Sequence, residues 1–189
     1  VYLPAGIYTV ANGNSQKIYA IADNGDVSEV AFTITGTDLV YGTDYTYPAD
    51  TGVLTIKSSA AMTISGTTIT DRIEVADGVS ANITLAGVNI DVSSQSNTAA
   101  FKIADNSTGN VTITLADGKT NTLKSGTDCA GLQKNGEYSE TLGKLTITGT
   151  GSLTATGGEN GAGIGGGDEG SSSNIEISGG KVIATGGDY

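Results

Sequence analysis

The chain has 189 residues and a net charge of −11, and it contains 29 glycines but no histidine or tryptophan. Without histidine it lacks the usual general base and metal ligand, and its acidic balance disfavours binding to a nucleic acid backbone. No segment approaches the roughly 18 consecutive apolar residues of a membrane-spanning helix, so we expect no membrane insertion. The single cysteine, Cys129, allows neither an internal disulfide nor a cysteine zinc site.

The first 57 residues differ in composition from the rest. They contain six of the eight tyrosines, both prolines and a strand-like run over residues 52–56. A stack of β-strand turns needs a covered end, because its last turn otherwise exposes a dry core and open strand edges. We therefore expect residues 1–57 to form a β-rich N-terminal cap or a small β-sandwich. The similarity of residues 32–35 to later blocks leaves open that this segment already contains one turn of the stack.

From residue 58 onward, a short block of alternating apolar and polar residues returns. Its copies span residues 62–65, 83–86, 111–114, 145–148 and 175–178, at intervals of 21, 28, 34 and 30 residues. The alternation gives each block one dry face and one wet face, which is typical of a half-buried β-strand. Glycine follows each block closely, where its permissive backbone suits a turn.

Two further apolar columns accompany the repeated block. One precedes it at Ile73, Phe101, Leu132 and Ile164, and the other follows it at Ile69, Ile90, Leu123, Leu153 and Val182. Each repeat therefore offers three short strands, and no segment shows the period of a helix. Strands that return in the same order favour parallel stacking, in which each turn satisfies the backbone hydrogen bonds of the next. The sequence predicts an all-β fold in which residues 58–189 form a right-handed parallel β-helix, a three-sided solenoid with a C-terminally truncated repeat array.

Both ends of the sequence resemble internal positions of a longer chain. It begins at Val1 without a methionine, and residues 184–187 repeat residues 155–158 and then stop where the earlier copy continues. We expect an excerpt of a longer protein, with flanking repeats of the same chain as its neighbours.

Two stretches resemble known sequences. Residues 110–123, which read NVTITLADGKTNTL, resemble the signature of a clostridial carbohydrate-binding family. That resemblance implies a calcium-binding, right-handed parallel β-helix that recognises acidic plant polysaccharides and is similar in fold to pectate lyases. The glycine-rich residues 161–167, with residues 178–182 after them, are similar to repeat arrays in large surface proteins of gut Firmicutes. Together the resemblances cover roughly residues 71–187. They imply an extracellular protein, secreted or on a bacterial cell surface, with a polysaccharide or host glycan as partner.

Acidic and amide side chains line up at the turn between the third strand of one repeat and the first strand of the next. Asp128 and Asn160 share one column with Asn97, and Glu159 occupies the neighbouring column, which Asp188 joins one turn later. Stacked turns would set these oxygens about 5 Å apart, where like charges repel unless a cation bridges them. Because Ca²⁺ takes six to eight oxygen ligands in irregular geometry, we expect Ca²⁺ as cofactor. The predicted ligands are Asp128, Glu159, Asn160 and Asp188. Polar turn residues that only hydrogen-bond the backbone would produce the same pattern.

Tyr138 is the candidate sugar contact. It lies in the longest insertion between repeats, residues 133–143, and loops on a rigid scaffold are where binding groups tend to reside. An exposed loop tyrosine without a partner would look the same in the sequence.

A glycine motif at residues 161–166 has the form G-x-G-x-x-G of dinucleotide-binding turns. Such a site needs a helix N-terminus after the motif, but here Asp168, Glu169 and a run of serines follow. The motif therefore favours a turn of the solenoid over a nucleotide site.

The sequence contains few groups of residues that could form a catalytic site. A polysaccharide lyase of this fold needs a lysine or arginine base, and the candidates are Lys102 and Arg72, which follows Asp71. A lone Arg–Asp neighbour pair is more often a surface ion pair. Glycoside hydrolysis needs two carboxylates at a set separation, and the adjacent Asp168 and Glu169 lie in a Gly/Ser loop.

These patterns predict a non-catalytic, extracellular carbohydrate-binding module of a bacterial surface protein, directed at acidic polysaccharide. The alternative is a structural stalk or adhesin segment without a glycan ligand. Such a segment needs only regular walls of glycine and threonine, without a binding site. A polysaccharide-lyase-like enzyme is the third interpretation.

Overall fold

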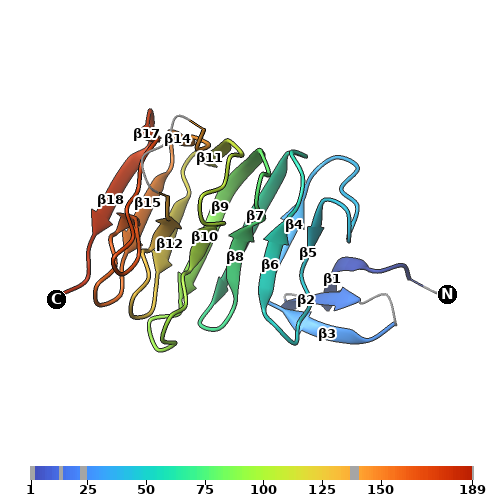
Figure 1. The fold of residues 1–189 in the computed structure, drawn as a ribbon. Helices are drawn as coiled ribbons and strands as arrows, with labels where there is room; N and C mark the ends of the chain where they lie inside the picture. Colours follow the sequence, from blue (N-terminus) through green and yellow to red (C-terminus); the bar gives the residue numbers. More distant parts are fainter. Residues whose placement is uncertain (1–2, 13–14, 22–24, 137–140, 189) are drawn as a thin grey trace.

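The computed structural model describes residues 3–12, 15–21, 25–136 and 141–188. These residues form strands β1 to β18 and no helix, so they contain no helix that could cross a membrane. From β6 onward most strands belong to a parallel β-solenoid of about four turns, as the sequence predicted, and the N-terminal strands lie at one end of it (Figure 1).

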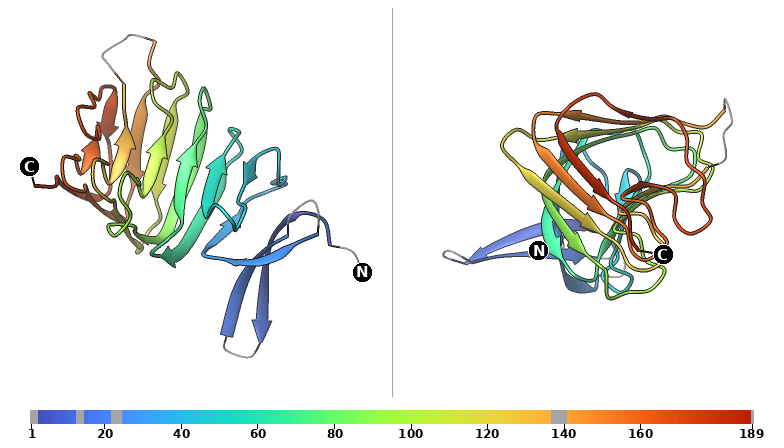
Figure 2. Two further views of the ribbon diagram at one scale, coloured as in Figure 1. Left: turned by 60° about the horizontal axis from the view of Figure 1, so that its bottom comes forward. Right: turned by 90° about the vertical axis from the view of Figure 1, so that its left-hand side faces the viewer.

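Three walls of parallel strands enclose the core (Figure 2). The first wall contains β6 (Val53–Ile56), β8 (Arg72–Val75), β10 (Phe101–Ile103), β13 (Leu132–Lys134) and β16 (Ile164–Gly165). The second contains β7 (Met62–Thr68), the start of β9 (Ala81–Asp91), β11 (Val111–Leu115), β14 (Leu145–Gly149) and β17 (Ile175–Ile177). The third contains the ends of β7 and β9 together with β12 (Thr120–Lys124), β15 (Ser152–Thr156) and β18 (Lys181–Thr185).

The inward column of the first wall is the one predicted from the sequence. Ile73, Phe101, Leu132 and Ile164 are paired in register, and the first three are fully buried. Leu54 of β6 extends the column by one strand toward the N-terminus and is also fully buried. Each parallel neighbour thus adds one apolar side chain to the column.

The register of the second wall differs from the predicted alignment by two residues at one step. Ile83 pairs with Ile113, 30 residues later along the chain, whereas the sequence alignment set Ile83 against Val111. Because side chains alternate with a period of two, a two-residue shift leaves every side chain on its predicted face. The alternation therefore predicted the buried face correctly while leaving the pairing undetermined.

The predicted column of the third wall is partly wrong. Thr68 and not Ile69 pairs with Ile90; Thr68 is buried, and Ile69 is 70% exposed. Leu153 pairs with Asn121, and Leu123 pairs with Ala155, so the two leucines belong to different columns. The polar residues Thr68 and Asn121 thus take places that the sequence pattern assigned to apolar ones.

The N-terminal strands are antiparallel. β1 (Gly6–Asn12), β2 (Ser15–Ile21) and β3 (Val27–Val30) form a separate sheet, and β5 (Tyr45–Thr46) pairs with β6. β4 (Phe32–Thr35) runs antiparallel to β7, so it is not a parallel turn of the stack but a cover for the edge of the second wall. An antiparallel strand in this place ends the parallel repeat, because the next turn would need the opposite chain direction.

Tyr47 joins this N-terminal segment to the first turn. Its buried hydroxyl accepts hydrogen bonds from the backbone N–H groups of Ala31 (3.0 Å) and Phe32 (3.3 Å), and donates one to the carboxylate of Asp71. Its ring stacks on Phe32 with centroids 5.5 Å apart. Burial, together with the neighbouring Asp71 carboxylate, raises the pKa of Tyr47 far above its ordinary value, which keeps the hydroxyl a donor.

Candidate functional site

The predicted column of acidic and amide residues exists at the turn that follows the third wall. Asn97, Asp128 and Asn160 all adopt the left-handed conformation, with φ of 53°, 65° and 63°. Short polar side chains tolerate this conformation better than others, which explains the Asn/Asp column in the sequence. We call residues 96–97, 127–128, 159–160 and 188 the turn column.

Backbone hydrogen bonds hold the turn column together. The N–H groups of Asn97, Asp128 and Asn160 each donate to a carbonyl one turn further on, at Thr127 (3.1 Å), Glu159 (2.7 Å) and Asp188 (3.1 Å). All four predicted metal ligands therefore lie in one turn column. The sequence alignment alone predicted that these four residues lie at the same turn of successive repeats.

The side chains of the four candidate ligands do not converge on one point. The Asn160 amide nitrogen donates to one oxygen of the Asp128 carboxylate at 3.0 Å, so this pair is held together by a direct hydrogen bond. Asn160 lines one cavity, whereas Glu159 and Asp188 line another, which Lys124 also lines. Among the described residues, no group of three or more acidic, cysteine or histidine side chains is arranged to hold a metal ion. Calcium binding here thus stays a prediction, and it would need backbone or amide oxygens as further ligands.

Chelation tests the calcium prediction directly. If Ca²⁺ bridges the turn column, excess chelator should lower the melting temperature by about 5–10 °C relative to a calcium concentration 100-fold above Kd, because a ligand specific to the folded state stabilises it by mass action. Differential scanning calorimetry in calcium and in chelator provides the measurement. Superimposable melting curves would remove calcium as a structural element.

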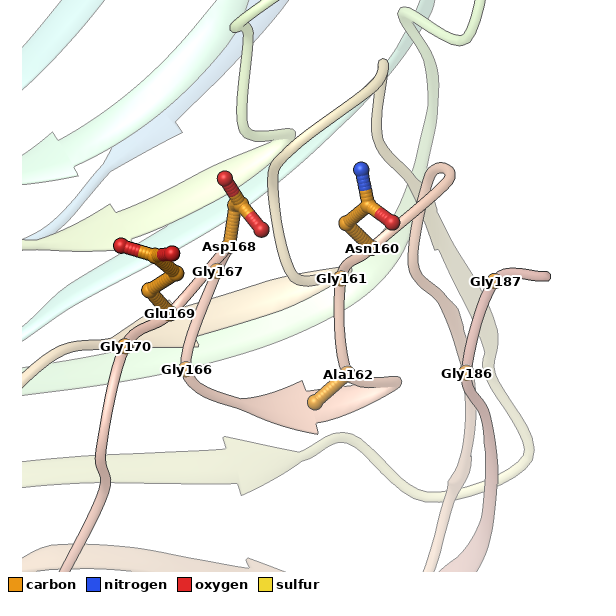
Figure 3. Close-up of a pocket in the computed structure, with 10 residues that line it drawn as sticks. All are labelled: Asn160, Gly161, Ala162, Gly166, Gly167, Asp168, Glu169, Gly170, Gly186 and Gly187. Atoms are coloured by element: carbon orange, nitrogen blue, oxygen red, sulfur yellow. The ribbon is translucent and has the colours of Figure 1, made fainter. Parts of the chain in front are cut away.

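A cavity of about 470 Å³ lies beside the turn column (Figure 3). Its lining comprises Asn160, Ala162, Asp168, Glu169 and glycines 161, 166, 167, 170, 186 and 187. In Figure 3 the side chains of Asn160 and Asp168 extend to the same side, away from Ala162. The backbone of Asp168 is tied to the column, since its N–H donates to the Asp128 carbonyl at 2.9 Å. We call this space the column cavity.

Several glycines of the column cavity are needed for backbone packing. A Cβ on Gly161 would lie 2.0 Å from the Cys129 carbonyl oxygen, and one on Gly166 would lie 1.9 Å from that of Gly170. Residues 161–176 contain no helix, so the helix N-terminus that a phosphate site requires is absent from this segment. Its acidic side chains, Asp168 and Glu169, would also repel phosphate. The glycine motif is therefore explained by close approach of other backbone segments, from the preceding turn at Gly161 and from the same loop at Gly166.

The candidate lyase bases form ion pairs on the first wall. The Arg72 Nε lies 3.0 Å from Glu74, and the Lys102 Nζ lies 3.1 Å from Asp105. The expected Arg72–Asp71 pair is therefore replaced by Arg72–Glu74, because the Asp71 carboxylate accepts from Tyr47 and from Thr70. Both ion pairs are partly exposed. Neither Arg72 nor Lys102 is therefore oriented by a buried carboxylate for proton abstraction.

Asn121 and Lys134 are among the buried polar residues that the sequence pattern did not predict. Asn121 is fully buried: its side-chain oxygen accepts from the N–H groups of Gly87 and Val88, both at 2.9 Å, and its nitrogen donates to the Ser152 carbonyl. Lys134 is 4% exposed, occupies the inward column of Ile103, and donates to the Ser173 carbonyl at 2.8 Å. The sequence gives one sign of each burial: a polar residue stands where the apolar–polar alternation predicts an inward, apolar side chain.

The buried Lys134 should make stability depend on pH. Burial lowers its pKa in the folded chain below the ordinary value near 10.5, so the unfolded chain binds more protons between the two values and stability should rise with pH there. Lys134→Met removes this contribution. We expect the wild type to gain stability relative to the variant as the pH increases from 7 to 10, measured by urea unfolding. A difference that stays constant with pH would show that Lys134 titrates normally.

Tyr138, the predicted sugar contact, lies outside the described residues. Phe101 points into the core and Tyr189 is also outside the described part, so no aromatic side chain of the described solenoid residues 58–136 and 141–188 is exposed. The aromatic surface that the structure does describe belongs to the N-terminal segment.

Comparisons with protein-family models, with curated proteins and with solved structures find no match to this chain. The fold is therefore described from the structure alone. The resemblance of residues 110–123 to a carbohydrate-binding signature stays a prediction.

Proposed function

We propose that the chain is a non-catalytic, extracellular glycan-binding module. The observation that supports it best is the column cavity, a space of sugar size on the side of a rigid scaffold, bordered by Asn160, Asp168 and Glu169. Carboxylate and amide groups are the usual partners of sugar hydroxyls, because they accept several hydrogen bonds in a small space. The rigid turns beneath the cavity spare the complex the cost of ordering its binding groups.

Acidic polysaccharide is the proposed ligand, with Ca²⁺ between the polymer and the chain. Asp168 and Glu169 would repel a uronate directly, and neither pairs with a basic side chain that lines the column cavity. A cation bound between protein and polymer carboxylates removes that repulsion and adds oxygen coordination. The proposal therefore requires that uronate binding depends on calcium.

The test is retention of polygalacturonate, first with calcium and then with excess chelator. We expect retention only with calcium, and a loss of about tenfold or more when Asp168→Asn and Glu169→Gln are combined, since both carboxylates border the column cavity. Asp77→Asn is the matched control, because Asp77 is an exposed carboxylate outside the cavities described here. Tyr138→Ala is a further variant, which we expect to lose retention without a change in melting temperature.

A structural stalk is the second candidate, favoured by the regular register of the turns from β9 to β18. In that role β16, β17 and β18 would pair with flanking repeats of the same longer chain. A stalk retains neither acidic nor neutral polysaccharide with calcium present, so the same experiment separates the two functions. Release of an unsaturated product from polygalacturonate would instead support the lyase.

A further inference from the structure

We propose a second sugar site in the N-terminal segment, specific for one neutral sugar ring. A cavity of about 300 Å³ lies there, lined by Ala20, Asp26, Ser28, Tyr41, Pro48, Ala49 and Asp50. This volume is at the lower end for ligand pockets, which suits a single ring at the end of a glycan better than a long polymer segment. The inference rests on the proposed glycan-binding function for its ligand class, and it adds a site that shares no residue with the column cavity. We call it the tyrosine cavity.

One part of the tyrosine cavity is apolar and rigid. The Tyr41 ring meets the Tyr45 ring edge to face, with centroids 5.6 Å apart, and its hydroxyl accepts from the Tyr47 N–H at 3.4 Å. A ring already fixed by two neighbours loses little conformational freedom when a ligand packs against it. Sugar rings carry an apolar face of C–H groups that packs well against aromatic and proline side chains, and Pro48 and Ala49 continue this surface.

The polar part of the cavity selects the charge of the ligand. Asp50 and Ser28 supply a carboxylate and a hydroxyl, and no basic side chain is among the described residues that line the cavity. Hydrogen bonds from sugar hydroxyls to a carboxylate are charge-assisted and therefore stronger than neutral ones. A uronate would meet the like charge of Asp50, so the chemistry favours a neutral sugar.

The loops that carry these residues are held by internal hydrogen bonds. The first loop spans residues 40–45. In it, the Gly42 N–H donates to the Tyr45 carbonyl (2.7 Å) and the Asp44 N–H donates to the Val40 carbonyl (2.8 Å). The Asp44 carboxylate accepts from the Val40 N–H and from Ser58, which lowers its pKa and keeps it charged.

The second loop is a short turn closed on Pro48. The Gly52 N–H and the Thr51 hydroxyl both donate to the Pro48 carbonyl, at 3.1 Å each. Asp50 thus extends from a turn with a defined shape. Both loops can present their groups without first becoming ordered, which is the condition for affinity in a small site.

The experiment is an array of neutral oligosaccharides that also carries polygalacturonate fragments, applied to wild type, Asp50→Ala and the control Asp77→Ala. Asp50 is exposed, so its replacement should leave the fold intact. We expect binding to neutral sugars in the wild type and the control, and about a tenfold or greater loss in Asp50→Ala, from the removal of a charge-assisted hydrogen bond.

Amide chemical shifts of the wild type with the strongest neutral sugar locate the contact without any mutation. Shifts confined to residues near Tyr41, Ser28 and Asp50 support the tyrosine cavity, and shifts confined to the column cavity overturn it. Binding restricted to polygalacturonate would overturn this inference and leave the proposed function standing. Absence of binding to every glycan with calcium present would overturn both.

Discussion

Ile147→Ala should lower the free energy of unfolding by about 2–5 kcal/mol, because the change opens a cavity in a core only one side chain deep per strand. Ile147 is fully buried on the second wall, paired with Ile113 on one side and Ile177 on the other. Ile113 cannot collapse onto the space, since its strand β11 is hydrogen-bonded to a neighbouring strand on both sides. Urea unfolding followed by circular dichroism measures the loss.

Thr146→Ala is the matched control for this prediction. Thr146 is the preceding residue on the same strand, points outward, and is only half-buried, between Thr112 and Glu176. We expect it to cost well under half as much as Ile147→Ala, because an exposed change leaves no cavity. Equal penalties at the two positions would mean that the strand faces the other way.

Asn121→Ala should cost about 2–4 kcal/mol. The side-chain oxygen of Asn121 is the acceptor for the N–H groups of Gly87 and Val88, where β9 passes from the second wall to the third. Removing it leaves those two donors without a partner in a buried place, and each such group costs about 1–3 kcal/mol. The loss of the Ser152 carbonyl's donor adds to the penalty.

Asn121→Leu separates hydrogen bonding from volume. Leucine fills the space and matches Leu153, which occupies the same column one turn later, but it cannot accept from the two N–H groups. We expect Asn121→Leu to be destabilised by more than 1 kcal/mol as well. If Asn121→Leu proved as stable as wild type, the column would be held by packing alone. Thr122→Ala, next to it and outward, should have a small effect.

The sequence alone determined the fold class and the buried faces of the strands in the first and second walls. Alternation with a period of two marks which side chains are buried, and returning blocks in a constant order require parallel neighbours. The first-wall column from Ile73 to Ile164 was correct to the residue, because its large apolar side chains have only one matching partner in each repeat. Asn97, Asp128 and Asn160 were aligned correctly for a local reason: each occupies a left-handed turn position that favours a short polar residue.

Only the tertiary structure decided the register of the other walls. A shift of two residues preserves the buried face, so Ile113 and Val111 were equally acceptable partners for Ile83 until neighbouring turns were stacked. The inward place of Asn121 could not be predicted, since a buried polar residue is tolerated only where it meets hydrogen-bond partners, and those of Asn121 come from other turns. The two cavities depend on the same stacking. The column cavity joins residues 160–170 to Gly186 and Gly187, and the tyrosine cavity joins β2 and β3 to residues 41–50. Such contacts cannot be predicted from spacing along the chain, because they arise only when separate turns and loops pack together.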